Sequence, residues 1–322
     1  MKAIYYEKYG TPDNFRLEEI DKPIPKGDEV LVKVKASSIN SWDWDLTTGR
    51  PYAYRLMFGL FKPAKNVIGI DIAGVVEEVG PEVKGLKVGD EVYGDISAAG
   101  FGGFAEYASA PERLIALKPK NLSFEEAAAV PHGGVLALQS VEFRGKLEPG
   151  QRILINGAGG STGPFALQMA KEQDLHVTCV DSSDKFDLLR SLGADEVVDY
   201  RSQDYTRINK TFDLIIDVMA KRSVWDYKRA LAPGGSIAIV GGAINTILSS
   251  LIVGGMITRF SDRRIGIVAH DPGRTYLDRL TKMLESEKLK PIIERTYPLE
   301  QVPEAIARLG AGKSLGKLII TI

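Results

Sequence analysis

The sequence has very little cysteine and little histidine. Its 322 residues include one cysteine, Cys179, and three histidines, His132, His176 and His270. One thiol cannot build a disulfide framework or a zinc site with several thiolate ligands. The histidines are also far apart in the sequence, so no cluster with metal-ligand spacing is present. These shortages lead us to expect no bound metal.

The chain also lacks an excess of either charge and lacks a long apolar run. It has 41 basic and 42 acidic residues, with a net charge of -1. Nucleic acids and anionic membranes are bound by fields of one sign, which this balance does not supply. The longest apolar stretch, around residues 244–258, contains asparagine, serines and glycines and falls short of the ~20 residues of a membrane span. The start, MKAIYYEKYG, has no apolar signal-peptide core. We therefore expect a cytoplasmic protein with a small-molecule partner and no nucleic acid or membrane partner.

The first ~120 residues predict an irregular β-barrel. Short β-like runs, such as 30–36 and 74–79, alternate with Pro, Gly and Asp breakers, such as the segment 22–28. The last residues, 318–322, again form an apolar run typical of a strand, and we expect this strand to return to the first domain. The first domain is therefore predicted to comprise residues 1–122 and 288–322.

The pattern changes at Ser123, which forms a capping box with Glu126 at the start of a helix. Helical patterns then alternate with short, continuous apolar strands. Five such strands are expected, at residues 152–156, 176–180, 196–200, 212–217 and 236–240. Continuous apolar strands joined by helices indicate a doubly wound parallel sheet, so the fold class is α/β. This second domain is predicted to span residues 123–287, including a helix near 274–286.

A glycine-rich loop follows the strand at 152–156. The pattern G-x-G-x-x-G fits with alanine in its first position, as Ala158-Gly159-Gly160-Ser161-Thr162-Gly163. Gly160 then allows the backbone to approach a pyrophosphate, and Gly163 allows close packing of helix on strand. The helix amino terminus faces the negative charge. We expect a dinucleotide here, with Ser161 and Thr162 in the same loop.

One acidic residue bears on which dinucleotide is bound. Asp181 ends the next strand, 18 residues after Gly163, where an acid favours the ribose 2'-hydroxyl of NAD(H).

Several motifs resemble those of the medium-chain dehydrogenase/reductase superfamily, in its zinc-independent quinone oxidoreductase and enone reductase branch. The resemblance covers essentially the whole chain. Its motifs, in chain order, are residues 36–44, 69–80, 88–94, 102–107, the glycine loop, 191–195 and 231–235. It implies an amino-terminal GroES-like β-barrel domain and a Rossmann domain, with the cofactor in the cleft between them.

The resemblance also bears on metal binding and on the site. Zinc-dependent relatives have cysteine where this chain has Asn40 and histidine where it has Ile70, and His132 lies where a third ligand would sit. A catalytic zinc needs three protein ligands, so we expect His132 to line the pocket or to support a helix. Asn40 is implied to lie beside the nicotinamide and to bind the cofactor or a substrate oxygen. The alternative for Asn40 is a turn residue after a strand.

The remaining candidate residues are less specific. Asp43 is expected to hold its loop through backbone hydrogen bonds, and Tyr52 and Tyr54 to line the substrate entrance or to pack. Asp45 departs from the relatives, many of which have a basic residue there. Gly241 and Gly242 are implied to meet the nicotinamide side of the cofactor, or to form a turn.

Two lysines and three further donors concern phosphate binding. Lys313 and Lys317 lie near the last strand and are able to reach a phosphate, although we expect both side chains to be exposed at the surface. The resemblance places 2'-phosphate contacts near Ser182, Lys185 and Tyr200. We expect NADP(H) slightly in preference to NAD(H), because three compatible donors outweigh one acid that is able to rotate into solvent while Lys185 bridges. The sequence leaves the orientation of Asp181 open.

The function that the resemblance implies is reduction of a quinone or of the activated C=C bond of an α,β-unsaturated carbonyl compound, using NAD(P)H and no metal. Two alternatives remain. One is a zinc-free carbonyl or alcohol dehydrogenase, and the other is a catalytically idle dinucleotide-binding protein that acts as a redox sensor or partner subunit. A homodimer is possible.

Overall fold

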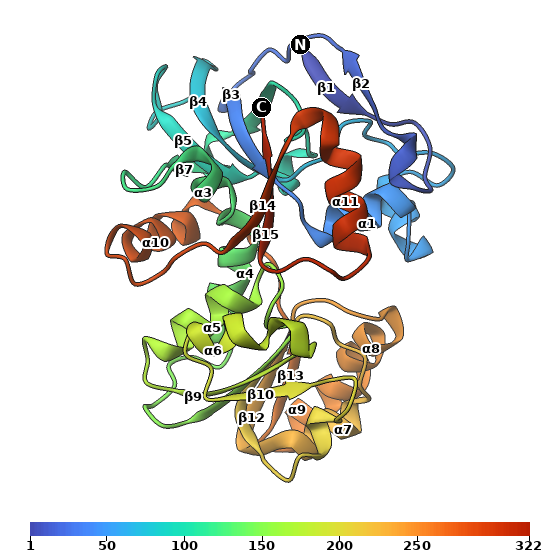
Figure 1. Ribbon diagram of the computed structural model, residues 1–322, viewed down its shortest axis with the longest axis vertical. Coiled ribbons are helices and arrows are strands. Elements are labelled where there is room, and N and C mark those ends of the chain that lie inside the picture. The colour runs from blue at the N-terminus through green and yellow to red at the C-terminus, as the bar shows by residue number, and fades with distance from the viewer. The chain divides into compact units, whose positions relative to one another are not determined.

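The computed structural model describes all 322 residues and divides the chain into two compact units (Figure 1). The first comprises Met1–His132, Pro272–Glu287 and Pro291–Ile322, and the second comprises Gly133–Asp271 and Lys288–Lys290. The predicted boundaries, at residues 123 and 287, differ from this division. The helix near 274–286 lies in the first unit, not in the dinucleotide domain.

The first unit contains a seven-stranded sheet in the order β14-β15-β3-β4-β5-β7, with β6 also paired to β3. A separate antiparallel pair is formed by β1 and β2. The strands are β1 (Lys2–Tyr5), β2 (Arg16–Glu19), β3 (Glu29–Ser38), β4 (Asp71–Val79), β5 (Glu91–Asp95), β6 (Tyr107–Pro111), β7 (Ile115–Leu117), β14 (Ile293–Pro298) and β15 (Lys317–Thr321). The predicted β-rich first domain is confirmed.

Alternation of side chains along β3 builds one core of this unit. Val30, Val32 and Val34 are two residues apart, so they point to the same face and pack with Ile72 of β4. β15 pairs antiparallel with β3 through Ile319 opposite Ser38. The carboxyl-terminal strand therefore returns to the first unit, as the sequence predicted.

The helices of the first unit are α1 (Ser41–Thr48), α2 (Arg55–Phe58), α3 (Phe124–Ala128), α10 (Arg274–Glu285) and α11 (Val302–Gly310). The predicted capping box of Ser123 and Glu126 is present. Two hydrogen bonds explain why α10 belongs here: the Tyr93 hydroxyl donates to the Leu277 carbonyl, and the Asn121 amide donates to the Leu284 carbonyl, both at 2.9 Å.

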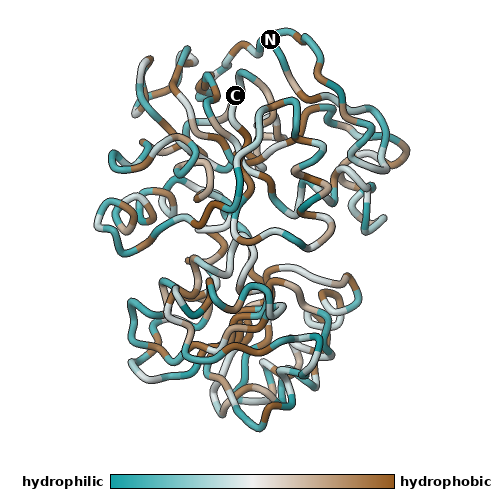
Figure 2. Tube along the Cα trace, viewed as in Figure 1, coloured by the Kyte–Doolittle hydropathy of each residue, from teal (hydrophilic) through white to brown (hydrophobic).

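The second unit is a six-stranded parallel sheet in the order β10-β9-β8-β11-β12-β13. The strands are β8 (Arg152–Asn156), β9 (His176–Asp181), β10 (Glu196–Asp199), β11 (Phe212–Asp217), β12 (Leu231–Ile239) and β13 (Arg264–Ile267). Its central strands are apolar, as their brown colour in Figure 2 shows. The order reverses between β8 and β11, and doubly wound sheets bind ligands at the carboxyl ends of strands at such a point.

Helices cover both faces of this sheet. They are α4 (Pro131–Val141), which contains the boundary between the units, α5 (Gly163–Lys171), α6 (Phe186–Ser191), α7 (Val224–Ala230), α8 (Ile244–Ser249) and α9 (Gly255–Phe260). Figure 1 shows α5 and α6 on one face and α7 and α9 on the other. The predicted doubly wound α/β fold is confirmed. No helix in the chain is both long enough and apolar enough to span a bilayer.

Gly163 is one of the positions where this fold requires the absence of a side chain. A Cβ on Gly163 would overlap the backbone of Ala158, whereas the nearest atom to a Cβ on Gly160 would be the Gly157 carbonyl oxygen at 3.5 Å. We expect Gly163→Ala to lower the melting temperature by several degrees, because β8 and α5 must separate. Gly160→Ala is the matched control and should leave the melting temperature within about 1 °C in thermal unfolding. Equal melting temperatures for the two variants would contradict this account.

Candidate functional site

The glycine loop in the second unit forms a tight turn between β8 and α5. Gly157 has a φ of 81°, in the left-handed region that favours glycine. The amides of Gly157 and Ala158 both donate to the carbonyl of Val180, at 3.0 and 3.2 Å. Thr162 precedes Gly163 at the start of α5, and Ser161 is partly exposed. The predicted strand, loop and helix are present, with Gly157 making the turn just before Ala158.

Asp181, at the end of β9, is tied to this loop. One carboxylate oxygen accepts from the Gly159 amide at 2.8 Å, and the other accepts from the Ser182 amide at 2.8 Å. Lys185 lies 3.3 Å from the second oxygen and forms an ion pair with it. These bonds hold Asp181 in a buried position, so it does not turn into solvent. Bridging of a phosphate by Lys185 stays a prediction.

Ser182, Lys185 and Tyr200 lie together at the ends of β9 and β10. The Tyr200 amide donates to the carbonyl of Asp181 at 3.4 Å, and the Tyr200 side chain is exposed. The Arg201 guanidinium lies 5.6 Å from the centre of the Tyr200 ring. Arg201 is thus a second cation in this region, and it pairs with Asp184 at 3.7 Å. This second cation was not identified from the sequence.

Gly241 and Gly242 follow β12, and the backbone explains both. Ala220 donates its amide to the Gly241 carbonyl at 2.9 Å, and a Cβ on Gly242 would overlap the Ala220 backbone. Close approach of two chain segments is thus sufficient reason for Gly242. Their implied contact with nicotinamide stays a prediction.

The first unit contains a buried polar cluster around Asp71, the first residue of β4. One carboxylate oxygen of Asp71 accepts from the Asn40 side-chain amide at 2.9 Å, from the Ser38 hydroxyl at 2.7 Å and from the Lys317 ammonium at 3.0 Å. The other accepts from the His132 backbone amide at 2.9 Å. Asp71 and Asn40 are fully buried and Lys317 is 1% exposed. A buried carboxylate is tolerated only when it is paired and hydrogen-bonded in this way.

This cluster occupies the polar atoms of Asn40. Its side-chain nitrogen donates to Asp71 and, at 3.3 Å, to the Ser38 carbonyl, while its oxygen accepts from Lys317 at 2.8 Å. Both amide hydrogens are therefore used inside the protein. This arrangement contradicts direct donation by Asn40 to a substrate oxygen and makes Asn40 a positioning residue. The surface exposure expected for Lys317 is also wrong, whereas Lys313 is exposed as expected.

Asp43 supports the same loop through backbone hydrogen bonds, as the sequence predicted. Its carboxylate accepts from the backbone N–H of Asn40 at 2.7 Å and from the backbone N–H of Gly69 at 3.2 Å. Burial raises the pKa of Asp43 to about 7, and the two backbone donors act in the opposite direction. Asp43 therefore holds the backbone at Asn40 in place at the start of α1.

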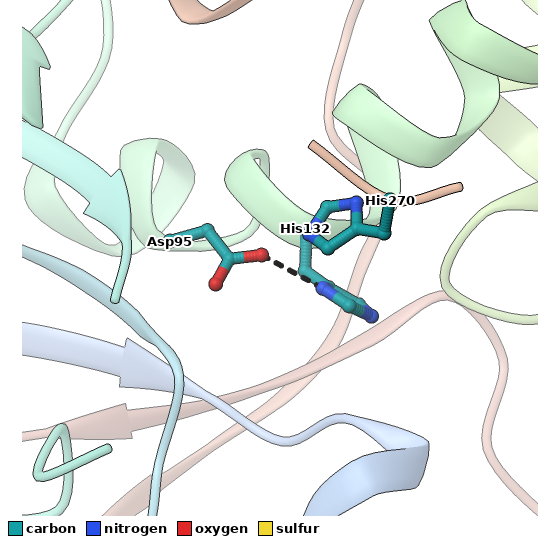
Figure 3. Close-up of side chains that lie close together, drawn as sticks. All are labelled: Asp95, His132 and His270. Carbon is teal, nitrogen blue, oxygen red and sulfur yellow. Dashed lines mark hydrogen bonds and ion pairs between the residues drawn. The ribbon is translucent and has the colours of Figure 1, made fainter. Parts of the chain in front are cut away.

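His132 is buried, and its ring is held by Asp95 at the end of β5. The His132 Nδ1 and an Asp95 carboxylate oxygen share a hydrogen bond of 2.8 Å (Figure 3). The His132 ring also lies 6.3 Å from the ring of Trp42. Because its backbone amide binds Asp71, His132 connects the polar cluster to an aromatic group. Of its two expected roles, helix support is confirmed, and pocket lining stays a prediction.

Tyr52 and Tyr54 lie in the segment before and into α2. Tyr52 is exposed, and the Arg55 guanidinium is 5.0 Å from the centre of its ring. Tyr54 is half-buried and meets Phe58 edge to face, with ring centres 6.4 Å apart. The structure brings Tyr54, but not Tyr52, into the group of aromatic rings around Phe58.

Sequence reasoning missed Asp71, and it named Lys317 only as a lysine able to reach a phosphate, not as the partner of Asp71. A charged residue at the start of each of two apolar strands was the available signal. β4 and β15 both pair with β3, so one residue from each meets at the same end of the sheet. Asp217, at the end of β11, is buried among the hydroxyls of Tyr205 and Tyr227 and the amide of Asn156. Burial raises the pKa of Asp217, and its role here is structural.

A zinc ion does not fit the donors at Asn40. Ile70 is apolar and fully buried, and the Lys317 ammonium 2.8 Å from the Asn40 oxygen places a positive charge where a cation would bind. A reduced dinucleotide does fit the second unit. The loop presents a glycine-lined turn at the amino terminus of α5, at the switch point of a parallel sheet.

These features define a dinucleotide-binding protein of the Rossmann type. Residues 26–120 match the model for the alcohol dehydrogenase GroES-like domain, and residues 192–320 match that for zinc-binding dehydrogenases. The chain belongs to the medium-chain dehydrogenase/reductase superfamily and is an NAD(P)H oxidoreductase.

Individual relatives are similar over nearly the whole chain. A 2-methylene-furan-3-one reductase of Solanum lycopersicum is 34% identical, covering 99% of this chain and 79% of the relative. An NADPH-dependent alkenal/one oxidoreductase, chloroplastic, of Arabidopsis thaliana is 33% identical with the same coverage. The structure of a quinone oxidoreductase from Coxiella burnetii superposes with a TM-score of 0.88 at 28% identity, covering 100% of this chain and 99% of that one.

Removal of the Lys317 charge should destabilise the first unit strongly. In Lys317→Met the buried Asp71 carboxylate loses its cation, and breaking a buried pair costs about 3–5 kcal/mol. Lys313→Met removes an exposed lysine four residues away and is the matched control. Denaturant unfolding should show the loss only for Lys317→Met, and it should be smaller when Asp71→Asn is added. Equal stability of the two lysine variants would refute the ion pair.

Asp45 should make the protein less stable as the pH rises. Burial raises the pKa of Asp45 to about 7, and in an unfolded chain it is about 4. Between these values the folded state binds more protons than the unfolded state, so stability falls as pH rises through this range. Asp45→Asn should raise the melting temperature at pH 8 by a few degrees and change it little at pH 4. Asp43 titrates similarly but accepts two backbone hydrogen bonds, so Asp43→Asn should lower the melting temperature at both pH values. A pH-independent effect of Asp45→Asn would contradict this assignment.

Proposed function

We propose that the chain uses NADPH, in preference to NADH, to reduce a quinone or the activated C=C bond of an α,β-unsaturated carbonyl compound, without a metal. The observation that carries the proposal is the glycine loop with the Asp181–Lys185 ion pair beside it. The names of the relatives, a 2-methylene-furan-3-one reductase, an alkenal/one oxidoreductase and a quinone oxidoreductase, support the substrate class.

The dinucleotide would be held by the loop and the end of β9. Ser161, Thr162 and Gly163 would offer their amides to its pyrophosphate, because amides at the start of α5 are donors without helical partners. Ala158 and Gly160 would line the turn, since their amides bond to the carbonyls of Val180 and Gly157. When bound, the reduced dinucleotide supplies a hydride. The chain's part is to bind and orient it.

Charge at the end of β9 supports NADPH. Asp181 alone would repel a 2'-phosphate, but Lys185 neutralises it at 3.3 Å. Arg201 and Ser182 lie nearby, but Arg201 pairs with Asp184 at 3.7 Å and the Ser182 hydroxyl donates to Asp181 at 3.4 Å, so both would have to turn to the phosphate. A relative whose name specifies NADPH agrees with this preference.

Metal independence is supported by the residues at the expected ligand positions. Asn40 bonds to Lys317 and Asp71, and Ile70 offers no ligand atom. The substrate oxygen must therefore be stabilised by hydrogen-bond donors, because no Lewis acid is available in this proposal. Asn40, Asp43 and Asp71 would fix the loop from which such a site is built.

Location and assembly stay predictions. A cytoplasmic location is expected from the sequence, although relatives include proteins named chloroplastic and mitochondrial. A homodimer remains possible.

A substrate scan tests this proposal directly. Purified protein is mixed with a panel of quinones, enones and saturated ketones, with NADPH or NADH, before and after treatment with a chelator. We expect oxidation of NADPH with quinones or enones, weaker activity with NADH, and no effect of the chelator. Activity restricted to ketones would indicate a carbonyl reductase, and dinucleotide binding without turnover would indicate a redox sensor. Loss of activity together with stoichiometric zinc would refute metal independence.

The Lys185→Ala variant tests the cofactor preference separately. It removes the cation that neutralises Asp181, so NADPH should bind about tenfold more weakly or worse, with NADH nearly unaffected. Asp181→Ser is the matched variant and should strengthen NADPH binding. Tighter binding of NADH than of NADPH by the unmodified protein would overturn the preference.

A further inference from the structure

A group of aromatic rings in the first unit lies next to His132. Trp42 in α1 meets Phe58 edge to face at 5.9 Å between ring centres, and Phe101 at 6.2 Å. Phe58 and Phe101 are 5.7 Å apart. All three side chains are half-buried, in contrast to the fully buried residues of the core. We call Trp42, Phe58 and Phe101 the aromatic group.

Packing against a core and hydrogen bonds to the backbone hold the aromatic group in place. Phe58 and Phe101 pack against a core of the first unit that includes Tyr6, Leu46 and Ile68. The Tyr9 hydroxyl donates to the carbonyls of Phe58 and Gly59, at 3.0 and 2.7 Å. A rigid aromatic surface loses little conformational entropy when it binds a ligand.

Phe101 has a backbone conformation that a bulky residue rarely adopts. Its φ is 75°, in the left-handed region, between two glycines that also have positive φ. Such a conformation is strained for a residue other than glycine, and residues of this kind cluster at functional sites. A glycine at position 101 would remove this strain, which the phenyl ring offsets through its contacts with the core and with Trp42 and Phe58.

Trp42 also offers an unused hydrogen-bond donor. Its indole N–H has no acceptor in the protein, although Trp42 contacts three rings, including that of His132. A half-buried tryptophan combines a flat apolar face with one polar N–H. A ligand that matches both features is a flat conjugated ring that carries a carbonyl oxygen.

We propose that the aromatic group determines substrate specificity by binding a planar cyclic quinone against the rings, with its carbonyl oxygen near the Trp42 indole N–H. The inference rests on the proposed function and narrows it. A short acyclic alkenal has the same electrophilic bond but no ring to stack, so it gains little from these side chains. Trp42 is therefore a specificity residue, and His132 and Asn40 position it through the polar cluster.

The experiment compares naphthoquinone with hexenal as substrates, with NADPH. Trp42→Leu should lower kcat/KM for naphthoquinone about tenfold, mainly through KM, and change that for hexenal less than about twofold. Trp42→Phe keeps a ring and loses the N–H, so its effect should be intermediate. Phe61→Leu is the matched control, because Phe61 is an exposed aromatic residue of the same segment outside the aromatic group. Phe61→Leu should leave kcat/KM unchanged for both substrates.

Further measurements separate this inference from the proposed function. Melting temperatures establish that the variants fold. If Trp42→Leu does not fold, Phe101→Leu is compared on naphthoquinone and hexenal in its place. If the unmodified protein turns over neither substrate, the proposed function fails, and calorimetric titration with naphthoquinone then decides the inference. Weaker binding by Trp42→Leu than by the unmodified protein and by Phe61→Leu supports it. Equal binding, or an equal loss of activity on both substrates, overturns it.

Discussion

The buried ion pair between Asp71 and Lys317 is the interaction on which the first unit depends. It joins β4 to β15, the strand formed by the end of the chain, and both strands pair with β3. Asn40, Ser38 and the His132 backbone amide supply the other hydrogen bonds to Asp71. Burial of a charged pair is costly unless all its polar atoms are satisfied, so this geometry is tightly constrained. The backbone around Asn40 and His132 takes its position from that constraint.

The second unit also contains a buried carboxylate, that of Asp181, which is stabilised by different partners. Asp181 bonds to the backbone of the glycine loop, and Lys185 neutralises the charge that remains. The acid thus helps to shape the loop that receives a dinucleotide, while its repulsion toward phosphate is reduced. In the proposed function, this residue pair therefore connects the conformation of the loop with the preference for NADPH.

Asn40 illustrates how a family motif and a structure can assign different roles to one residue. The motif places Asn40 near the chemistry, but its amide is fully occupied by Asp71, Lys317 and the Ser38 carbonyl. Hydrogen bonds of this kind orient neighbouring groups instead of contacting a substrate. The aromatic group next to His132 then becomes the part of the first unit with ring faces and a donor available to a ligand.

The sequence by itself determined the two-part architecture, the parallel strands at 152–156 and 212–217 and the glycine loop. These features are local, because strand periodicity, capping residues and glycine spacing act over a few residues. Only the tertiary structure decided that α10 packs on the first unit, that Lys317 is buried and that Asp181 is fixed. Each of these depends on residues far apart in the chain, such as Tyr93 with Leu277. Pairings of this kind are set by strand order and burial, which no short sequence pattern encodes.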